Sequence, residues 1–177
     1  MACSLINSIP LDCRDSIGGI KEVKWKILPS LTTLAANYTL SSGVVTIASG
    51  SQTGWATLSQ EKEVASFTDT ITGNAQNGTN FSSQEVKVIF NKITSTLRNN
   101  LVLGAVQNRL HVAIRDMNDN YWLLGYERGM DIETAAGGSG TASGDRNGYE
   151  VTLKGMENVL YHLVNMSSAT YTTLVFA

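Results

Sequence analysis

The chain has 177 residues, of which 42% are hydrophobic and only 16% are charged, and its formal net charge is -2. This length suits one domain with a hydrophobic core, and the charge lacks the basic excess of proteins that bind nucleic acid tightly. Because no apolar run approaches the roughly 20 residues of a membrane span and MACSLINSIPLDCRDSIGG lacks the features of a secretion signal, we expect a protein made in a cytoplasm, with no membrane partner.

In chain order, residues 20–28 (IKEVKWKIL) alternate, with Val23 and Trp25 on one face and Lys24 on the other, which predicts a half-buried strand. GVVTIASG predicts a short strand between glycines. Residues 49–83 are polar and rich in turn formers, and EKEVASFTDTITG within them predicts a strand exposed on both faces, part of a long hairpin arm. QEVKVIFNKI then predicts a strand with Val86 and Val88 facing the core.

The segment TSTLRNNLVLGAVQN predicts a helix near residues 94–107, because Leu97, Leu101 and Ala105 recur every four residues and Thr94 or Ser95 can cap its start. RLHVAIRDM predicts a strand that buries Leu110, Val112 and Ile114 and leaves His111 on its polar face. The NDN turn follows, and YWLLGYERG, YEVTLKG and YTTLVFA predict three more strands.

This order has no repeating strand-helix unit, so it favours a mainly β fold with one flanking helix, an antiparallel β-sandwich or barrel. We expect an N-terminal arm, residues 1–19, and a single domain, residues 20–177.

The glycine-rich segment GGSGTASGDRNGYEVTLKG, residues 137–155, resembles a phosphate-binding loop only superficially. Gly138, Gly140 and Gly144 are spaced one residue too widely for a dinucleotide fingerprint, and no G-K-[ST] follows. The glycines also precede a strand, whereas phosphate loops open a helix. The segment therefore predicts a long connection that ends in the DRNG turn.

No catalytic or metal-binding pattern rises above background. Cys3 and Cys13 are expected to be reduced thiols, and His111 and His162 to be structural histidines. Asp116 and Asp119 flank a hairpin turn, where Asp is favoured, and Glu61 and Glu63 are more simply explained as solvated residues on one face of a strand. No G-x-S-x-G surrounds any serine. We expect no enzyme, no cofactor and no metal.

Two segments carry a resemblance to a known family. LDCRDSIGGIKEVKW, residues 11–25, and YWLLGYERGMDI with SGTASGDRNGYEVTLKGME, within residues 121–157, resemble the opening and closing blocks of tail tube proteins of tailed bacteriophages, of the type found in phages of Bacteroidetes hosts. The first block is the more specific, through CRDSIGGIKEV. Residues 31–107 carry no part of the resemblance.

The resemblance implies a virion protein that assembles as six-fold rings whose inner strands close into a continuous barrel. The rings stack around the channel through which genomic DNA passes at ejection, so the implied partners are other copies of the chain, other tail proteins and, transiently, DNA. The implied place is the virion tail, after assembly in a bacterial cytoplasm. The N-terminal arm would bridge subunits with Gly18 and Gly19 as its hinge, and the polar arm of residues 49–83 would reach the adjacent ring. The candidate subunit contacts are Cys13, Arg14, Asp15, Gly18, Gly19, Trp55, Asp145 and Arg146.

Two alternatives stay open at this point. A ring, collar or head-tail completion protein would form one closed ring and stop there. A monomeric β-sandwich that binds carbohydrate would need an exposed aromatic platform, and Trp55, in SQTGWATL, is the tryptophan that the sequence leaves free of a core face.

Overall fold

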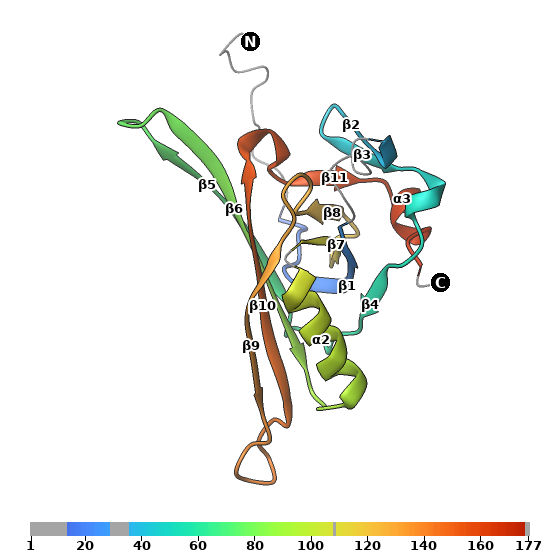
Figure 1. Cartoon of the computed structure of the whole chain (residues 1–177), viewed down its shortest axis with the longest axis vertical. Coiled ribbons are helices and arrows are strands. Elements are labelled where there is room, and N and C mark those ends of the chain that lie inside the picture. The colour runs from blue at the N-terminus through green and yellow to red at the C-terminus, as the bar shows by residue number, and fades with distance from the viewer. Residues whose placement is uncertain (1–13, 29–35, 108, 176–177) are drawn as a thin grey trace.

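The structure is a computed structural model that describes residues 14–28, 36–107 and 109–175, and Figure 1 shows how its sheets and helices are arranged. The strands are β1 (Ile20–Ile27), β2 (Tyr38–Ser41), β3 (Val44–Ile47), β4 (Ala56–Leu58), β5 (Ser66–Asn74), β6 (Thr79–Phe90), β7 (Leu110–Asp116), β8 (Tyr121–Leu124), β9 (Asp131–Gly138), β10 (Gly148–Asn158) and β11 (Val164–Met166). The helices are α2 (Ser95–Gln107) and α3 (Ser168–Thr172), with single 3-10 turns η1 (Ser49–Ser51) and η2 (Val159–Tyr161).

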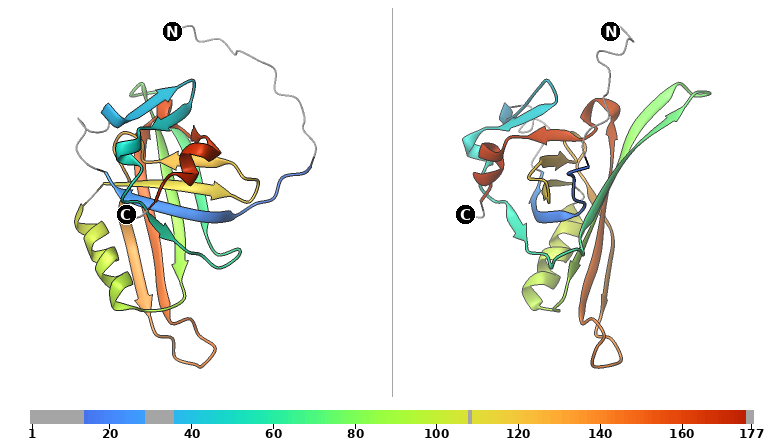
Figure 2. Two further views of the ribbon diagram at one scale, coloured as in Figure 1. Left: turned by 90° about the vertical axis from the view of Figure 1, so that its right-hand side faces the viewer. Right: turned by 180° about the vertical axis from the view of Figure 1, so that it is seen from behind.

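The strands form a seven-stranded sheet in the order β2-β3-β11-β8-β7-β1-β4 and a four-stranded sheet in the order β5-β6-β10-β9. All neighbours are antiparallel except β3 and β11, which are parallel. The predicted fold class, mainly β with one flanking helix in a sandwich, is confirmed, and neither sheet closes into a barrel within the described residues. Figure 2 shows the four-stranded sheet as the longer layer, with a hairpin projecting from each of its ends.

The first core lies between the two sheets. The predicted alternation holds in β6 and β10, where Val86, Val88, Val151 and Leu153 are completely buried against residues of the seven-stranded sheet. Helix α2 covers the end of this core with Leu101 and Gly104. A Cβ at position 104 would lie 3.0 Å from Cδ1 of Ile132, so glycine lets the helix approach β9 closely.

The helix prediction is confirmed, with its start fixed by a side chain. Thr94 Oγ1 accepts a hydrogen bond from the Leu97 amide at 3.1 Å, which satisfies one of the free donors at the helix N-terminus. Leu101 faces the core as expected. Ala105 is exposed instead, because the helix turns Gly104 toward β9.

A second core on the other face of the seven-stranded sheet overturns the prediction for His111. Five consecutive residues of β7, from Leu110 to Ile114, are buried, so this strand has no polar face. The His111 ring lies 4.9 Å from the Tyr38 ring, and its Nε2 lies 3.1 Å from the carbonyl oxygen of Tyr126. The prediction from alternation was wrong here because β7 is covered on both faces, so the side chains on both of its faces are buried. For the same reason both Leu123 and Leu124 of β8 are buried, and Trp122 is half-buried.

We expect His111 to make the stability of the protein fall in acid. Burial lowers the pKa of His111 from 6.5 to about 4, and the nearby Lys26 charge adds to this, against the opposing hydrogen bond to Tyr126. The unfolded chain therefore binds a proton that the native state excludes. The contribution of neutral His111 to the free energy of unfolding is complete above pH 6.5 and is lost as the pH falls toward 4. The loss amounts to about 3 kcal/mol.

Urea unfolding of the wild type and His111→Gln between pH 7 and pH 4 measures this contribution, because the carboxylates common to both proteins cancel in the difference. Between pH 7 and pH 4 the free energy of unfolding of the variant should fall by about 3 kcal/mol less than that of the wild type. Parallel curves would contradict the assignment.

The C-terminal segment also differs from the sequence prediction. YTTLVFA was predicted as a strand, but Tyr171 and Thr172 belong to α3, which Ser167 caps by accepting a hydrogen bond from the Thr170 amide at 3.1 Å. Lys24 Nζ donates to the carbonyl oxygens of Tyr171 and Leu174, at 3.3 and 2.9 Å, and is buried. The predicted polar face of β1 is thus covered by this segment.

Candidate functional site

The two outer strands of the four-stranded sheet are long and unprotected. In the described part of the chain β5 pairs only with β6, and β9 only with β10. They have nine and eight residues, whereas β2 and β4, the outer strands of the other sheet, have four and three. Neither SFTDTITGN nor DIETAAGG contains a lysine or a proline, the residues that commonly block edge pairing. These two edges are therefore the candidate site for association.

The strand directions make the two edges complementary to each other. Because the three pairings within the sheet are antiparallel, β5 and β9 run in opposite directions. If a second copy stands beside the first in the same orientation, its β5 is antiparallel to β9 of the first. One copy can therefore follow another indefinitely without breaking the antiparallel pattern, as a head-to-tail ring requires.

The sheet is also staggered. β5 pairs with residues 79–87 of β6, toward one end of the sheet, and β9 pairs with residues 148–154 of β10, toward the other. One row of cross-strand partners joins Ser66, Lys87, Thr152 and Thr134, so β5 begins where β9 is halfway along. Stagger of this kind is what closing a sheet into a barrel demands.

The outward face of this sheet is polar and mildly acidic. It carries two lysines, Lys87 and Lys154, and four carboxylates, which are Glu85, Asp131, Glu133 and Glu150. Lys87 lies 2.6 Å from Glu150, and Lys154 lies 3.1 Å from Glu133. The hydrogen bonds from Lys87 and Arg146 hold the pKa of Glu150 below its usual value. Both lysines of this face are therefore already paired with carboxylates.

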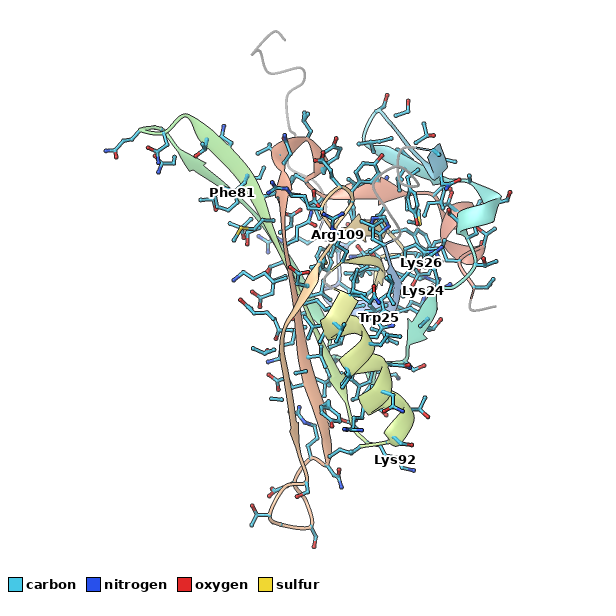
Figure 3. The ribbon with its side chains drawn as sticks, in the orientation of Figure 1. Lys24, Trp25, Lys26, Phe81, Lys92 and Arg109 are labelled. Atoms are coloured by element: carbon cyan, nitrogen blue, oxygen red, sulfur yellow. The ribbon has the colours of Figure 1, made fainter. Side chains whose placement is uncertain are left out.

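The β5–β6 hairpin extends beyond the body as an arm, as the sequence predicted. The pairing of β6 with β10 ends at Phe81, which Figure 3 labels, and residues 73–80 lie past that point. The β9–β10 loop, residues 139–147, projects from the opposite end of the same sheet (Figure 1). The two hairpins therefore point in opposite directions along the strands.

A buried carboxylate fixes the root of the arm. The Asp69 side chain is 1% exposed and lies 2.9 Å from His162 Nδ1. It accepts hydrogen bonds from the Ser82 hydroxyl, from Gln84 Nε2 at 3.3 Å and from the Leu163 amide at 2.9 Å. These contacts tie β5 and β6 to the segment between η2 and β11, so the arm starts from a rigid base.

The grouping of Ser82, Asp69 and His162 is not a catalytic triad. In a triad the histidine stands between the serine and the acid and takes the proton of the hydroxyl. Here Asp69 stands in the middle, and the Ser82 hydroxyl donates to it. Ser82 is completely buried as well, so the arrangement is structural.

A second buried carboxylate positions the root of β9. Glu157 Oε1 accepts hydrogen bonds from the amides of Glu127 and Arg128, at 3.2 and 2.8 Å, in the turn that leads into β9. Burial raises the pKa of Glu157, although the backbone donors oppose this shift. The turn is therefore held to β10 by a side chain as well as by strand pairing.

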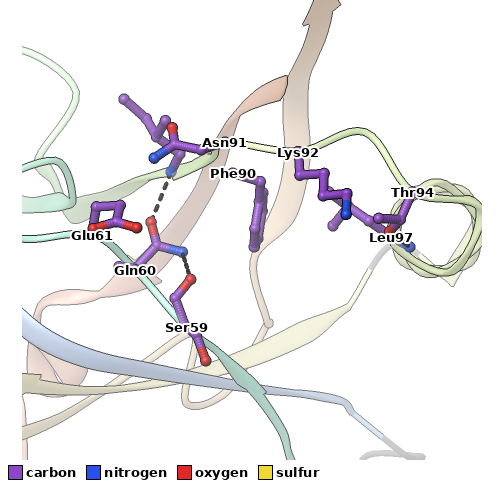
Figure 4. Close-up of a pocket in the computed structure, with 9 residues that line it drawn as sticks. Ser59, Gln60, Glu61, Phe90, Asn91, Lys92, Thr94 and Leu97 are labelled. Carbon is purple, nitrogen blue, oxygen red and sulfur yellow. Dashed lines mark hydrogen bonds between the residues drawn. The ribbon is translucent and has the colours of Figure 1, made fainter. Parts of the chain in front are cut away.

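A pocket of about 330 Å³ lies beside the start of α2 (Figure 4). Gln60 uses both ends of its amide there, accepting from the Ile89 amide at 2.9 Å and donating to the Ser59 carbonyl at 3.1 Å. Glu61 lines the pocket, but Glu63 lies in a turn with φ of 62°. The prediction that they share the face of a strand is wrong, because β5 begins only at Ser66.

The residues proposed as subunit contacts in the N-terminal arm are exposed where they are described. Cys13 lies outside the described residues, and Arg14, Asp15 and Gly18 are exposed. Gly19 has φ of 112°, and its carbonyl accepts a hydrogen bond from the Met117 amide at 3.2 Å. Gly19 is thus held beside the β7–β8 turn, in which Asp116 caps the backbone as expected.

Asp145 and Arg146 lie in the exposed β9–β10 loop. Asp145 Oδ2 accepts hydrogen bonds from the amides of Thr141 and Ala142, both at 2.8 Å, and these bonds lower its pKa. Arg146 lies 3.0 Å from Glu150. The predicted long connection is thus a hairpin loop with its own internal order, shortened by the extension of β9 to Gly138.

The expectation that Trp55 is free is wrong. Its side chain is 0% exposed, and Nε1 donates to the Ser51 carbonyl at 3.2 Å. The Trp55 amide also donates to the Val175 carbonyl at 3.1 Å, so the C-terminal segment closes over this part of the chain. Trp55 is a core residue, and its ring offers no surface to a partner or a sugar.

Sequence reasoning missed β9, the second of the two edges, because ETAAGG has no apolar alternation.

None of the helices in the described ranges is both long and apolar enough to cross a membrane. Over the same ranges, no group of three or more His, Cys, Asp or Glu side chains is placed to hold a metal ion. Comparison with protein-family models, with curated proteins and with solved structures finds no match to this chain.

Proposed function

We propose that this chain is a non-enzymatic structural protein of a bacteriophage virion that assembles into stacked rings and forms the tail tube. The observation that carries the proposal is the pair of long, open and complementary edges, β5 and β9, on one staggered sheet. An edge without a block pairs with another strand, and a closed ring satisfies every edge. The resemblance of residues 11–25 and 121–157 to tail tube proteins supports the same function and implies six copies in each ring.

In this assembly each copy contributes four strands to a continuous inner barrel, and the outward face of the four-stranded sheet lines the channel. Double-stranded DNA binds proteins largely through free Lys and Arg side chains that contact its phosphates. The lysines of this face are paired with carboxylates, and the carboxylates outnumber them. Such a lining lets DNA pass without retaining it.

The two projecting hairpins give the rings a means to stack. The β5–β6 arm extends from one end of the sheet and the β9–β10 loop from the other, so a ring placed on top of another brings arm and loop together (Figure 1). This feature favours a tube over a ring, collar or completion protein, which needs no contact along its axis. The burial of Trp55 removes the main support for a carbohydrate-binding module.

Light scattering of the purified chain over a range of concentrations tests the proposal. The mass should rise to that of a closed ring and then to larger multiples, because pairing at one edge leaves the other free until the ring closes. A protein that stays monomeric at high concentration would count against both assembly and the tail tube function.

A further inference from the structure

Helix α2 exposes apolar side chains beside the free edge of β9. Val102 and Val106 are 53% and 71% exposed, and Ala105 between them is exposed too. These three residues are named here the α2 ledge. Leu103, also about half exposed, lies on another flank of the helix and lines a different pocket with Trp25 and Ala56.

The ledge overhangs β9. Val102 and Ala105 line a shallow pocket of about 240 Å³ together with Ala135 of β9 and Tyr149 of β10. Figure 2, left, shows α2 at the β9 side of the four-stranded sheet, on the same side as the seven-stranded sheet. A strand added to the free edge of β9 would therefore have its inner face under the ledge.

The side chain that suits this place is Ile71 of β5. It pairs with the completely buried Ser82 of β6, so it points to the inner face of the sheet, yet it is 50% exposed within its own copy. Its outer neighbours Thr70 and Thr72 are exposed. Ile71 thus presents an apolar side chain on an open edge, where an added layer would bury it.

The geometry of a closed barrel brings Ile71 of one copy to the α2 ledge of its neighbour. Closed barrels tilt their strands by about 35 to 45°, which corresponds to a shift of about 1.0 to 1.5 residues at each strand and about four to six residues over four strands. Ser66 shares its row with Thr134, so the next copy places Thr70 or Thr72 beside Thr134. A shift of four residues also overlaps β5 and β9 over nearly their whole lengths.

With Thr70 beside Thr134, Ile71 of the second copy lies opposite Glu133, between Ile132 and Ala135; with Thr72 beside Thr134, it lies directly opposite Ala135. Ile132 and Ala135 are the two inner-face residues of β9 that α2 covers. We infer that the α2 ledge is the seat for β5 of a second copy of this chain, with Ile71 inserted between the ledge and β9. This inference rests on the proposed ring, and it adds a specific apolar contact to backbone pairing.

Cross-linking tests the inference in the full chain with Cys3→Ser and Cys13→Ser. The test protein carries Ile71→Cys and Val102→Cys, and the matched control carries Ile71→Cys and Leu103→Cys. All three sites are about half exposed, so folding should be retained, which circular dichroism checks. A short bis-maleimide is expected to give a ladder of covalent multimers, up to a ring, at least tenfold more efficiently in the test protein than in the control.

Equal cross-linking of the two proteins in samples that contain rings would overturn the inference and leave the ring intact. If neither protein associates, the proposed function and the inference both fail. As a second measurement, Val102→Asp should weaken self-association at least tenfold, and Leu103→Asp should not. Equal effects of the two substitutions would also contradict the packing of β5 from a second copy under the α2 ledge.

Discussion

Shortening the β5–β6 arm is expected to yield single rings in place of tubes. Thr72 and Phe81 are cross-strand partners, so residues 73–80 can be replaced by Asn-Gly, which suits a two-residue hairpin turn. The change leaves Asp69 and Ile71 in place and removes the part of the arm that extends past β10. Edges within a ring would still pair, whereas the contact between rings would lose one of its two hairpins.

Electron microscopy compares the shortened chain with the wild type at equal concentration. The rings should keep their diameter, because the overlap of β5 with β9 is preserved. A second variant, in which the β9–β10 loop is shortened between the partners Gly138 and Gly148, should give the same single rings if arm and loop meet. Tubes of ordinary length from the arm variant would show that stacking depends on another surface.

Asp69→Ala is expected to lower the free energy of unfolding by about 3 kcal/mol or more, since it leaves several buried donors without their acceptor. The Ser82 hydroxyl, Gln84 Nε2 and the Leu163 amide all donate to this carboxylate. The loss should be concentrated at the root of the arm. Relative to the wild type, hydrogen exchange should therefore accelerate more at the amides of β5 than at those of β7.

Asp145→Ala provides the control, because Asp145 also accepts hydrogen bonds, two of them from backbone amides, but is exposed in a loop. An exposed capping carboxylate of this kind contributes less than a buried one, because water can replace its hydrogen bonds. Urea unfolding of the two variants and the wild type gives the comparison. Similar losses for Asp69→Ala and Asp145→Ala would mean that the buried cluster does not hold the arm.

Sequence patterns predicted the elements that have one buried face and one exposed face. The alternation in β6 and β10 and the Leu spacing of α2 report such half-buried elements directly. β7 lost its expected polar face because a second core covers it, and that core is made by residues distant in the chain, including Tyr171 and Leu174. The burial of His111 and Trp55 follows from the same nonlocal packing.

The candidate site was predictable only in part. The two-sided polarity of residues 61–73 indicated an exposed arm, and the glycine-rich segment indicated a loop. That β5 and β9 are the two edges of one sheet depends on which strands pair, which local composition does not encode. The apolar residues of the α2 ledge look like core residues in the sequence, and only the position of the helix leaves Val102 and Val106 exposed.

A negative-stain image of the purified protein shows directly whether the chain closes into rings. We expect closed rings with an open channel, of one diameter, that stack into tubes as the protein concentration rises. Monomers at high concentration, or open filaments without a channel, would contradict the closure of β5 onto β9 around a ring.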